Sequence, residues 1–139
     1  TANPLGCAAA LASLDIPARE VASAEAMRFE LVVKNVYIVT TNCAGLVTGG
    51  TVSELWSNHH ELAEAVAREV IRIQESLTGQ NFYADALIQG ILTAFEGDPD
   101  HKCTGRSAPA RLARAIQQAD EAGLDIPRLR GIAAAQQTT

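Results

Sequence analysis

Three histidines are the side chains in this sequence best suited to bind a metal ion or move a proton near neutral pH. His59 and His60 are adjacent, and Glu64 follows His60 at a spacing that places both side chains on one helix face. A zinc site needs three or four ligands, however, and no further ligand is evident on this helix. We therefore expect no metal site and no cofactor. A metal-dependent activity of His59, His60 or His101 is kept as an alternative.

The segment 98–103, Asp-Pro-Asp-His-Lys-Cys, also contains metal-ligating side chains. It lacks the ordered oxygen ligands of a calcium loop and the spacing of a zinc knuckle. A Cys103–His101 catalytic pair would need a third group to orient the histidine, and the sequence shows none. We predict a solvated loop that carries a structural cysteine, and we expect the protein not to be an enzyme.

The three cysteines, Cys7, Cys43 and Cys103, form no metal-binding spacing. Cys43 and Cys103 both fall in expected loops, so they are the candidate pair for a disulfide in an oxidising compartment. Three reduced and mostly buried thiols are the equal alternative.

The glycine-containing segment 45–51 is a candidate anion-binding loop. If residues 36–42 form a strand, a strand–loop–helix unit would hold an anion on backbone N–H groups. The segment lacks the Lys-Ser/Thr of a P-loop and the spacing of a dinucleotide-binding motif. A helix–helix connection explains it equally well.

Arg106, Arg111 and Arg114 lie near the start of a predicted helix that ends in Asp120-Glu121. This order opposes the helix dipole, which favours acidic residues at the N-terminus. We interpret the three arginines as interface candidates for acidic residues within 1–101, for a second copy of the chain, or for a phosphate. Nucleic acid is an improbable partner because the chain is acidic and has no aromatic residues among its basic ones.

Charge is unevenly distributed along the chain, whose net charge is −5. Residues 1–101 carry five basic and thirteen acidic side chains, a charge of −8, and residues 102–139 carry six and three, a charge of +3. Opposite charges can attract within one fold or between two copies. A homo-oligomer or assembly is therefore the expected partner.

Two helices are predicted most firmly, at 51–78 and 81–96. Thr51 and Glu54 match a capping box at the start of the first. Beside the apolar stripe of the second helix runs a row of small residues that would admit a close neighbour. These residues are interface candidates: Ala86, Gly90 and Ala94.

Residues 29–42 are ambiguous between helix and strand, because β-branched residues are frequent there. We favour one helix that begins near Pro17 and frays near Thr41. The alternative is an α+β fold with a short strand, or a hairpin turning at Lys34-Asn35. Further helices are predicted over 7–14, after Ser107 as far as Gly123, and after Pro127.

Residues 3–15, Asn-Pro-Leu-Gly-Cys-Ala-Ala-Ala-Leu-Ala-Ser-Leu-Asp, resemble a short helical segment of fold-type-I pyridoxal-phosphate aminotransferases. The resemblance covers about a tenth of the chain, and the rest of the chain does not follow that family. No lysine stands in a context suited to the cofactor. The resemblance therefore implies no site residue and no activity here.

The sequence as a whole predicts a soluble, acidic, all-α protein: a single helical domain over residues 1–139, with four or five helices in a bundle. No apolar run approaches the ~20 residues of a membrane span, so no membrane association is expected. Localisation is left open.

The preferred function is a non-enzymatic helical interaction or self-assembling structural protein, with a carrier of a small apolar ligand as the alternative. A shared cluster is expected of four aromatic residues: Trp56, Phe82, Tyr83 and Phe95.

Overall fold

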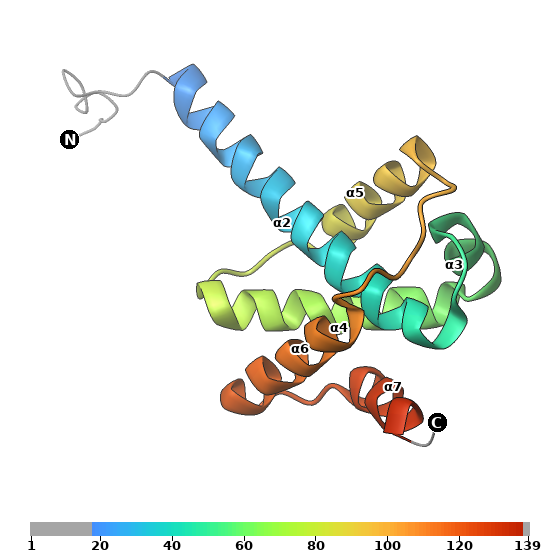
Figure 1. Cartoon of the computed structure of the whole chain (residues 1–139). Coiled ribbons are helices and arrows are strands. Elements are labelled where there is room, and N and C mark those ends of the chain that lie inside the picture. Colours follow the sequence, from blue (N-terminus) through green and yellow to red (C-terminus); the bar gives the residue numbers. More distant parts are fainter. Residues whose placement is uncertain (1–17, 138–139) are drawn as a thin grey trace. The chain divides into compact units, whose positions relative to one another are not determined.

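A computed structural model describes residues 18–137 of the chain. Contacts divide the chain into two units, residues 1–32 and residues 33–139, and each is described by itself. The described residues form helices and no β-strand, which confirms the all-α fold (Figure 1). The helices are α2 (Ala18–Thr48), α3 (Val52–Asn58), α4 (His60–Thr78), α5 (Ala84–Gly97), α6 (Ala108–Ala122) and α7 (Pro127–Gln137).

Helix α2 runs without a break through the ambiguous residues 29–42. The prediction of a helix there is confirmed, and the alternatives of a strand or hairpin are wrong. Burial outweighs the strand preference of the β-branched residues, since Val33, Val36 and Thr40 are all buried. The helix also continues to Thr48 instead of fraying near Thr41.

The part of α2 that belongs to the first unit has exposed side chains over residues 23–31. Three of them are large and apolar: Met27, Phe29 and Leu31. The predicted helix over 7–14, Cys7, and the segment 3–15 that resembles aminotransferases lie outside the described residues. The single-domain organisation of 1–139 stays a prediction.

One helical segment, Ser23–Thr48, is long and apolar enough to cross a membrane by length and composition. The expectation that the chain contains no such run was therefore too strict. Within this segment 39% of the most apolar window is buried inside the structure. Val33, Val36, Cys43 and Ala44 supply that buried surface, as residues of a core helix do.

A glycine pair separates α2 from α3. Gly49 and Gly50 have φ angles of 64° and 75°, a left-handed conformation in which glycine carries no steric penalty. Thr51 then forms the predicted capping box: its hydroxyl accepts from the Glu54 N–H at 3.2 Å, and the Glu54 carboxylate accepts from the Thr51 N–H at 2.9 Å. Residues 45–48 are thus the last residues of α2, and residues 49–51 form a helix–helix connection to α3. The strand–loop–helix anion site is not formed, since residues 36–42 are helical.

The helix predicted over 51–78 is interrupted at His59, which divides it into α3 and α4. His59 has φ −134° and ψ 40°, outside the helical region. Its N–H still donates to the Leu55 carbonyl and its carbonyl accepts from Ala63, each at 2.9 Å. The His59 side chain is exposed at this interruption.

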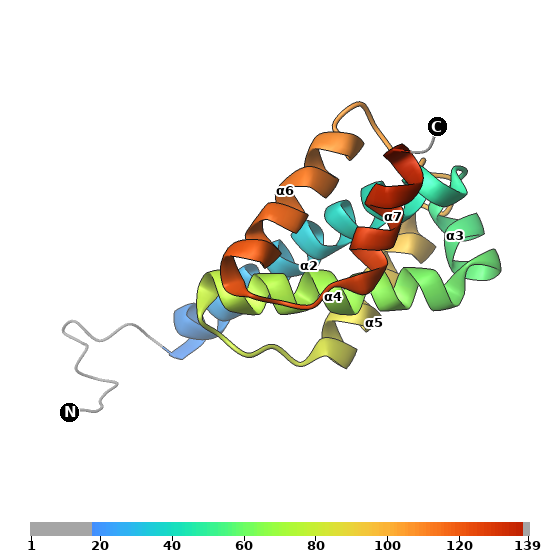
Figure 2. The ribbon, with the colours of Figure 1, turned by 90° about the horizontal axis from the view of Figure 1, so that it is seen from below.

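Helix α4 is the centre of the second unit and packs against α3, α5, α6 and α7. The two views show α5 on one side of α4, with α6 and α7 on the other (Figures 1 and 2). Helix α4 has a buried apolar stripe at helical spacing: Val66, Val70 and Ile73. Complete burial of such a side chain contributes about 1.5–3 kcal/mol, so this stripe is a main source of stability.

Helix α5 begins at Ala84, after the predicted start at residue 81. The chain ahead of it is held by the Phe82 N–H, which donates to the Glu75 carboxylate at 2.8 Å. Within α5, Gly90 packs against Val33 of α2: a Cβ at residue 90 would lie 2.9 Å from the Val33 Cγ2. Gly90 therefore admits a close neighbour, as predicted, and this neighbour belongs to the same chain.

Helices α6 and α7 lie where the sequence predicts them, after Ser107 and after Pro127. Pro109 lies in the first turn of α6 and Gly123, at φ 70°, ends it, but the Ser107 side chain makes no capping hydrogen bond. Helix α7 starts at Pro127 as predicted. Its N-terminus is capped by Glu69 of α4, a buried carboxylate that accepts 2.9 Å hydrogen bonds from the N–H groups of Arg128 and Leu129.

Candidate anion-binding surface

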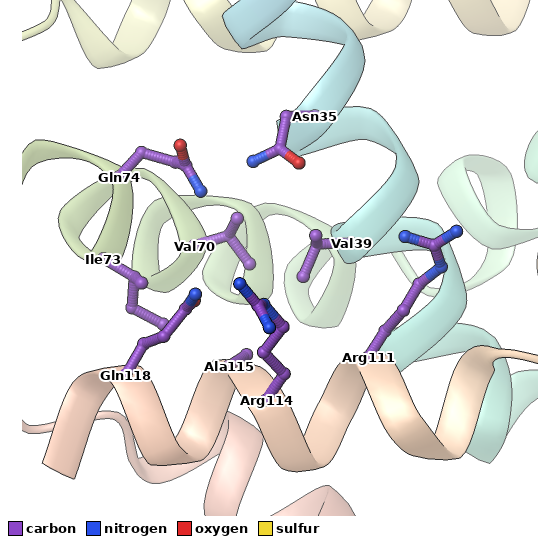
Figure 3. A pocket seen from close by; sticks show the side chains of 9 residues that line it. All are labelled: Asn35, Val39, Val70, Ile73, Gln74, Arg111, Arg114, Ala115 and Gln118. Atoms are coloured by element: carbon purple, nitrogen blue, oxygen red, sulfur yellow. The ribbon is translucent and has the colours of Figure 1, made fainter. Parts of the chain in front are cut away.

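Two of the three predicted interface arginines, Arg111 and Arg114, line a pocket between α2, α4 and α6 (Figure 3). The pocket has a volume of about 210 Å³. Helix α6 presents both arginines on one face because they are three positions apart. The lining residues are Asn35, Val39, Val70, Ile73, Gln74, Arg111, Arg114, Ala115 and Gln118.

The polar lining of this pocket consists of guanidinium and amide groups, with no carboxylate. Asn35 comes from α2, Gln74 from α4 and Gln118 from α6. Neither these three amide side chains nor the side chains of Arg111 and Arg114 hydrogen-bond to another described residue. Five polar side chains thus line the pocket with their hydrogen-bonding capacity available to water or a ligand.

Arg111 also lines a neighbouring, more open pocket that contains Lys102, Cys103 and Arg106. The two pockets therefore share Arg111 as a lining residue. We call the four exposed cations of this region, Lys102, Arg106, Arg111 and Arg114, the basic surface.

The loop that carries Lys102 and Arg106 is held against the start of α3. The Val52 N–H donates to the His101 carbonyl at 2.8 Å, and the Cys103 N–H donates to the Gly50 carbonyl at 3.0 Å. Gly45 lies directly under this loop, since a Cβ at residue 45 would be 2.6 Å from the Cys103 Cβ. These contacts fix the position of the basic surface relative to α2 and α3.

Other arginines of the second unit have acceptors within the chain. Arg68 forms ion pairs with Glu64 at 2.9 Å and Asp85 at 3.0 Å. Arg128 pairs with Glu61 at 3.4 Å, and Arg130 pairs with Asp120. Arg72 donates a hydrogen bond to the Asp125 carbonyl. Within the second unit, three arginine side chains make neither an ion pair nor a hydrogen bond with a described residue: Arg106, Arg111 and Arg114. Among the described residues, Arg106, Arg111 and Arg114 therefore have no acidic partner from the same chain.

The predicted disulfide is not formed in this structure, where Cys43 and Cys103 are both buried free thiols. Cys43 also lies in helix α2 and not in a loop, which corrects the basis of that prediction. Burial raises the pKa of the Cys43 thiol to about 12, with Arg111 acting in the opposite direction. Burial, with a smaller contribution from Glu54, raises the pKa of Cys103 to about 11. Both thiols are therefore protonated and unreactive near neutral pH.

The histidines have structural contacts. His60 interacts with Glu64 at 3.2 Å, at the predicted spacing, but Glu64 also accepts from Arg68. The His60 ring contacts the Trp56 ring with the centroids 4.0 Å apart and the planes tilted by 58°. His101 lies 3.5 Å from Asp98. Among the described residues, no three potential ligands gather into a metal site.

The aromatic cluster differs from the predicted one. Trp56 and Phe95 are in contact as expected, with centroids 6.0 Å apart, and Tyr37 of α2 joins them at 5.4 Å from Phe95. Tyr83 is 88% exposed and takes no part. Burial is the main cause that raises the pKa of Tyr37, with Asp98 and Cys103 adding to it.

Ala86 and Ala94 are exposed on α5 on either side of the Val33–Gly90 contact. The predicted interface residues therefore come from two parts of the sequence. Ala86, Gly90 and Ala94 belong to α5, whereas the three arginines belong to α6 and the loop before it. Sequence reasoning missed the pocket amides, Asn35, Gln74 and Gln118. These residues are ordinary on helix surfaces, and no spacing within the sequence connects three different helices.

Comparison with known protein families, curated proteins and solved structures found no match to this chain.

Proposed function

We propose that this protein is a non-enzymatic helical interaction protein that associates with a second copy of itself through the basic surface. One observation supports this proposal: Arg106, Arg111 and Arg114 form no ion pair with a residue in the described part of the chain. Arg68, Arg128 and Arg130, in contrast, are all paired. Unpaired cations at one site favour an acidic surface as the partner.

The chain itself supplies such an acidic surface. Glu96, at the end of α5, and Asp100, in the following loop, are exposed and form no ion pair with the described residues. Asp98, between them, is 3.5 Å from His101. The acidic group of one copy can therefore face the basic surface of another.

The strength of this association would depend on several weak pairs. An exposed ion pair contributes about 0–1 kcal/mol and is screened by salt over a Debye length of about 10 Å at 0.1 M. Self-association should therefore be favoured at low ionic strength and weaken as salt is added.

Light scattering across a series of protein concentrations, at low and at high salt, tests the proposal. We expect a mass above that of one chain at low salt, falling toward it at high salt. Arg106→Glu should lower the mass at low salt, whereas Lys34→Glu, the same charge change at an exposed residue of α2, should not. A strict monomer at every concentration, with no effect of salt, would rule out the proposal.

A mixing experiment identifies the two surfaces. The Arg106→Glu chain and a Glu96→Arg chain should each associate weakly alone, and a mixture of the two should recover association because the opposite charges meet again. A mixture that stays monomeric would exclude Glu96 as the facing residue.

The pockets described above have charged and amide walls, so they give no support to the alternative of an apolar-ligand carrier.

A further inference from the structure

The geometry of the pocket between α2, α4 and α6 points to a ligand site, and we propose that it binds a small organic anion through one carboxylate or phosphate group. The anionic group would bind the Arg114 guanidinium, with Arg111 adding positive charge at the edge of the pocket, and a short apolar body would lie on the pocket floor. This inference goes beyond self-association, because every residue that lines the pocket belongs to one chain.

The two guanidinium groups provide the charge that selects an anion. Arginine presents several N–H donors in a planar arrangement that matches the two oxygens of a carboxylate or phosphate. Neither Arg111 nor Arg114 has an ion-pair partner among the described residues, and no carboxylate lines the pocket. An incoming anion would therefore not have to displace a described acidic side chain of the same chain.

The three amide side chains add neutral donors around the same space. Asn35 and Gln74 lie on the side of the pocket away from α6, and Gln118 lies on α6 beside the arginines (Figure 3). An amide NH₂ group donates hydrogen bonds to anionic oxygens without adding charge. Because these groups come from three helices, they converge only when α2, α4 and α6 are packed together.

The floor and the size of the pocket limit the ligand. Val70, Ile73 and Ala115 are buried and apolar, and Val39 is half-buried beside them. A volume of about 210 Å³ is below the range of roughly 300–1,000 Å³ that accepts drug-sized ligands. The site therefore suits an anion with a body of a few carbon atoms or one aromatic ring.

Isothermal titration calorimetry with four probes tests the inference: phenyl phosphate, benzoate, inorganic phosphate, and benzyl alcohol as the neutral analogue. We expect saturable binding of one phenyl phosphate per chain, weaker binding of benzoate and phosphate, and no saturable binding of benzyl alcohol. Phenyl phosphate tighter than benzoate would indicate a phosphate ester as the natural class, and the reverse order a carboxylate.

Matched variants locate the site. Arg114→Met removes the charge but keeps an apolar stem, and it should weaken phenyl phosphate binding by about tenfold or more. Arg106→Met makes the same change on the basic surface outside this pocket, and it should alter binding by less than about twofold. Gln74→Leu and Gln118→Leu, each shown by circular dichroism to be folded, should weaken binding without changing charge.

Three results would overturn the inference: no saturable binding of any anionic probe, equal binding of benzyl alcohol and benzoate, or unchanged binding in both Arg114→Met and Gln118→Leu. The Arg106→Glu chain separates this inference from self-association. It should be monomeric and still bind phenyl phosphate, so either property can fail without the other.

Discussion

The α4–α7 junction and the basic surface both place charged side chains next to helix N-termini. The charge at the junction is buried and hydrogen-bonded, whereas the charges at the basic surface are exposed and have no ion pair among the described residues. At the junction, the buried Glu69 carboxylate receives two backbone N–H groups at the start of α7. At the basic surface, the exposed Arg106, Arg111 and Arg114 lie near the start of α6 with no ion pair to a described residue.

Burial explains this difference. A charge removed from water must be compensated by hydrogen bonds within the protein, or the fold loses several kcal/mol. An exposed guanidinium keeps its hydration, so it can remain unpaired at little cost. The junction therefore stabilises the fold, whereas the basic surface is free to bind a partner.

The largest expected effect is at the junction. Glu69→Ala leaves the N–H groups of Arg128 and Leu129 without their acceptor in a buried place, and it should lower the free energy of unfolding by about 2–4 kcal/mol. Urea unfolding followed by circular dichroism measures the change. Glu61→Ala, which removes only the exposed partner of Arg128, should cost less than about 1 kcal/mol. Equal losses in the two variants would contradict the role of Glu69.

The second-largest effect on stability is expected at Gly45, which packs under the loop that carries Lys102 and Arg106. Gly45→Ala would place a Cβ 2.6 Å from the Cys103 Cβ, and it should lower the free energy of unfolding by about 1–3 kcal/mol through overpacking. Gly97→Ala is the control, because a Cβ there would meet no atom within 4 Å. Differential scanning calorimetry should show a lower Tm only for Gly45→Ala. An unchanged Tm would mean that the loop is free to move away from α2.

The buried thiols beneath the basic surface predict a loss of stability at alkaline pH. The pKa of Cys43 is about 12 in the fold and about 8.5 in an unfolded chain, so the unfolded state loses its proton first as pH rises. The stabilisation is complete below the unfolded pKa and should fall by about 1–2 kcal/mol from about pH 8 to about pH 10. Urea unfolding of wild type and Cys43→Ala across this interval measures it. The variant should show the smaller slope, and parallel slopes would contradict the prediction.

The smallest effect is expected from the unpaired arginines. Replacing Arg111 and Arg114 together by Gln removes no ion pair with a described residue, and it should change the free energy of unfolding by less than about 0.5 kcal/mol. Arg68→Gln removes the pairs with Glu64 and Asp85 and should cost about 0.5–1 kcal/mol. Unfolding at low salt compares the two variants. A larger loss in the double variant would show that Arg111 or Arg114 stabilises the fold.

Local signals predicted most of the helical structure. The capping box at Thr51, the end of α6 at Gly123 and the start of α7 at Pro127 each depend on a few adjacent residues, and each is confirmed. The interruption at His59 was missed because the apolar spacing continues across it. Apolar residues at intervals of three and four indicate a helical face, but this pattern does not indicate where the backbone leaves the helical conformation.

The candidate site could be predicted only in part. The reversed charge order of α6 identified Arg106, Arg111 and Arg114, since it is visible within one helix. Asn35, Gln74 and Gln118 join Arg111 and Arg114 through packing between distant segments. The same limit explains the missed cap of α7, because Glu69 and Arg128 are 59 positions apart.

The sequence by itself determined that this protein is helical, where several helices begin and end, and that basic residues gather near the start of α6. Turn chemistry, capping and apolar periodicity act over a few residues, so they can be read without the fold. Only the tertiary structure decided which charges are paired, which thiols are buried, and that two arginines and three amides share one pocket. Those properties depend on which helix surfaces meet, and this is set by the packing of the whole unit around α4.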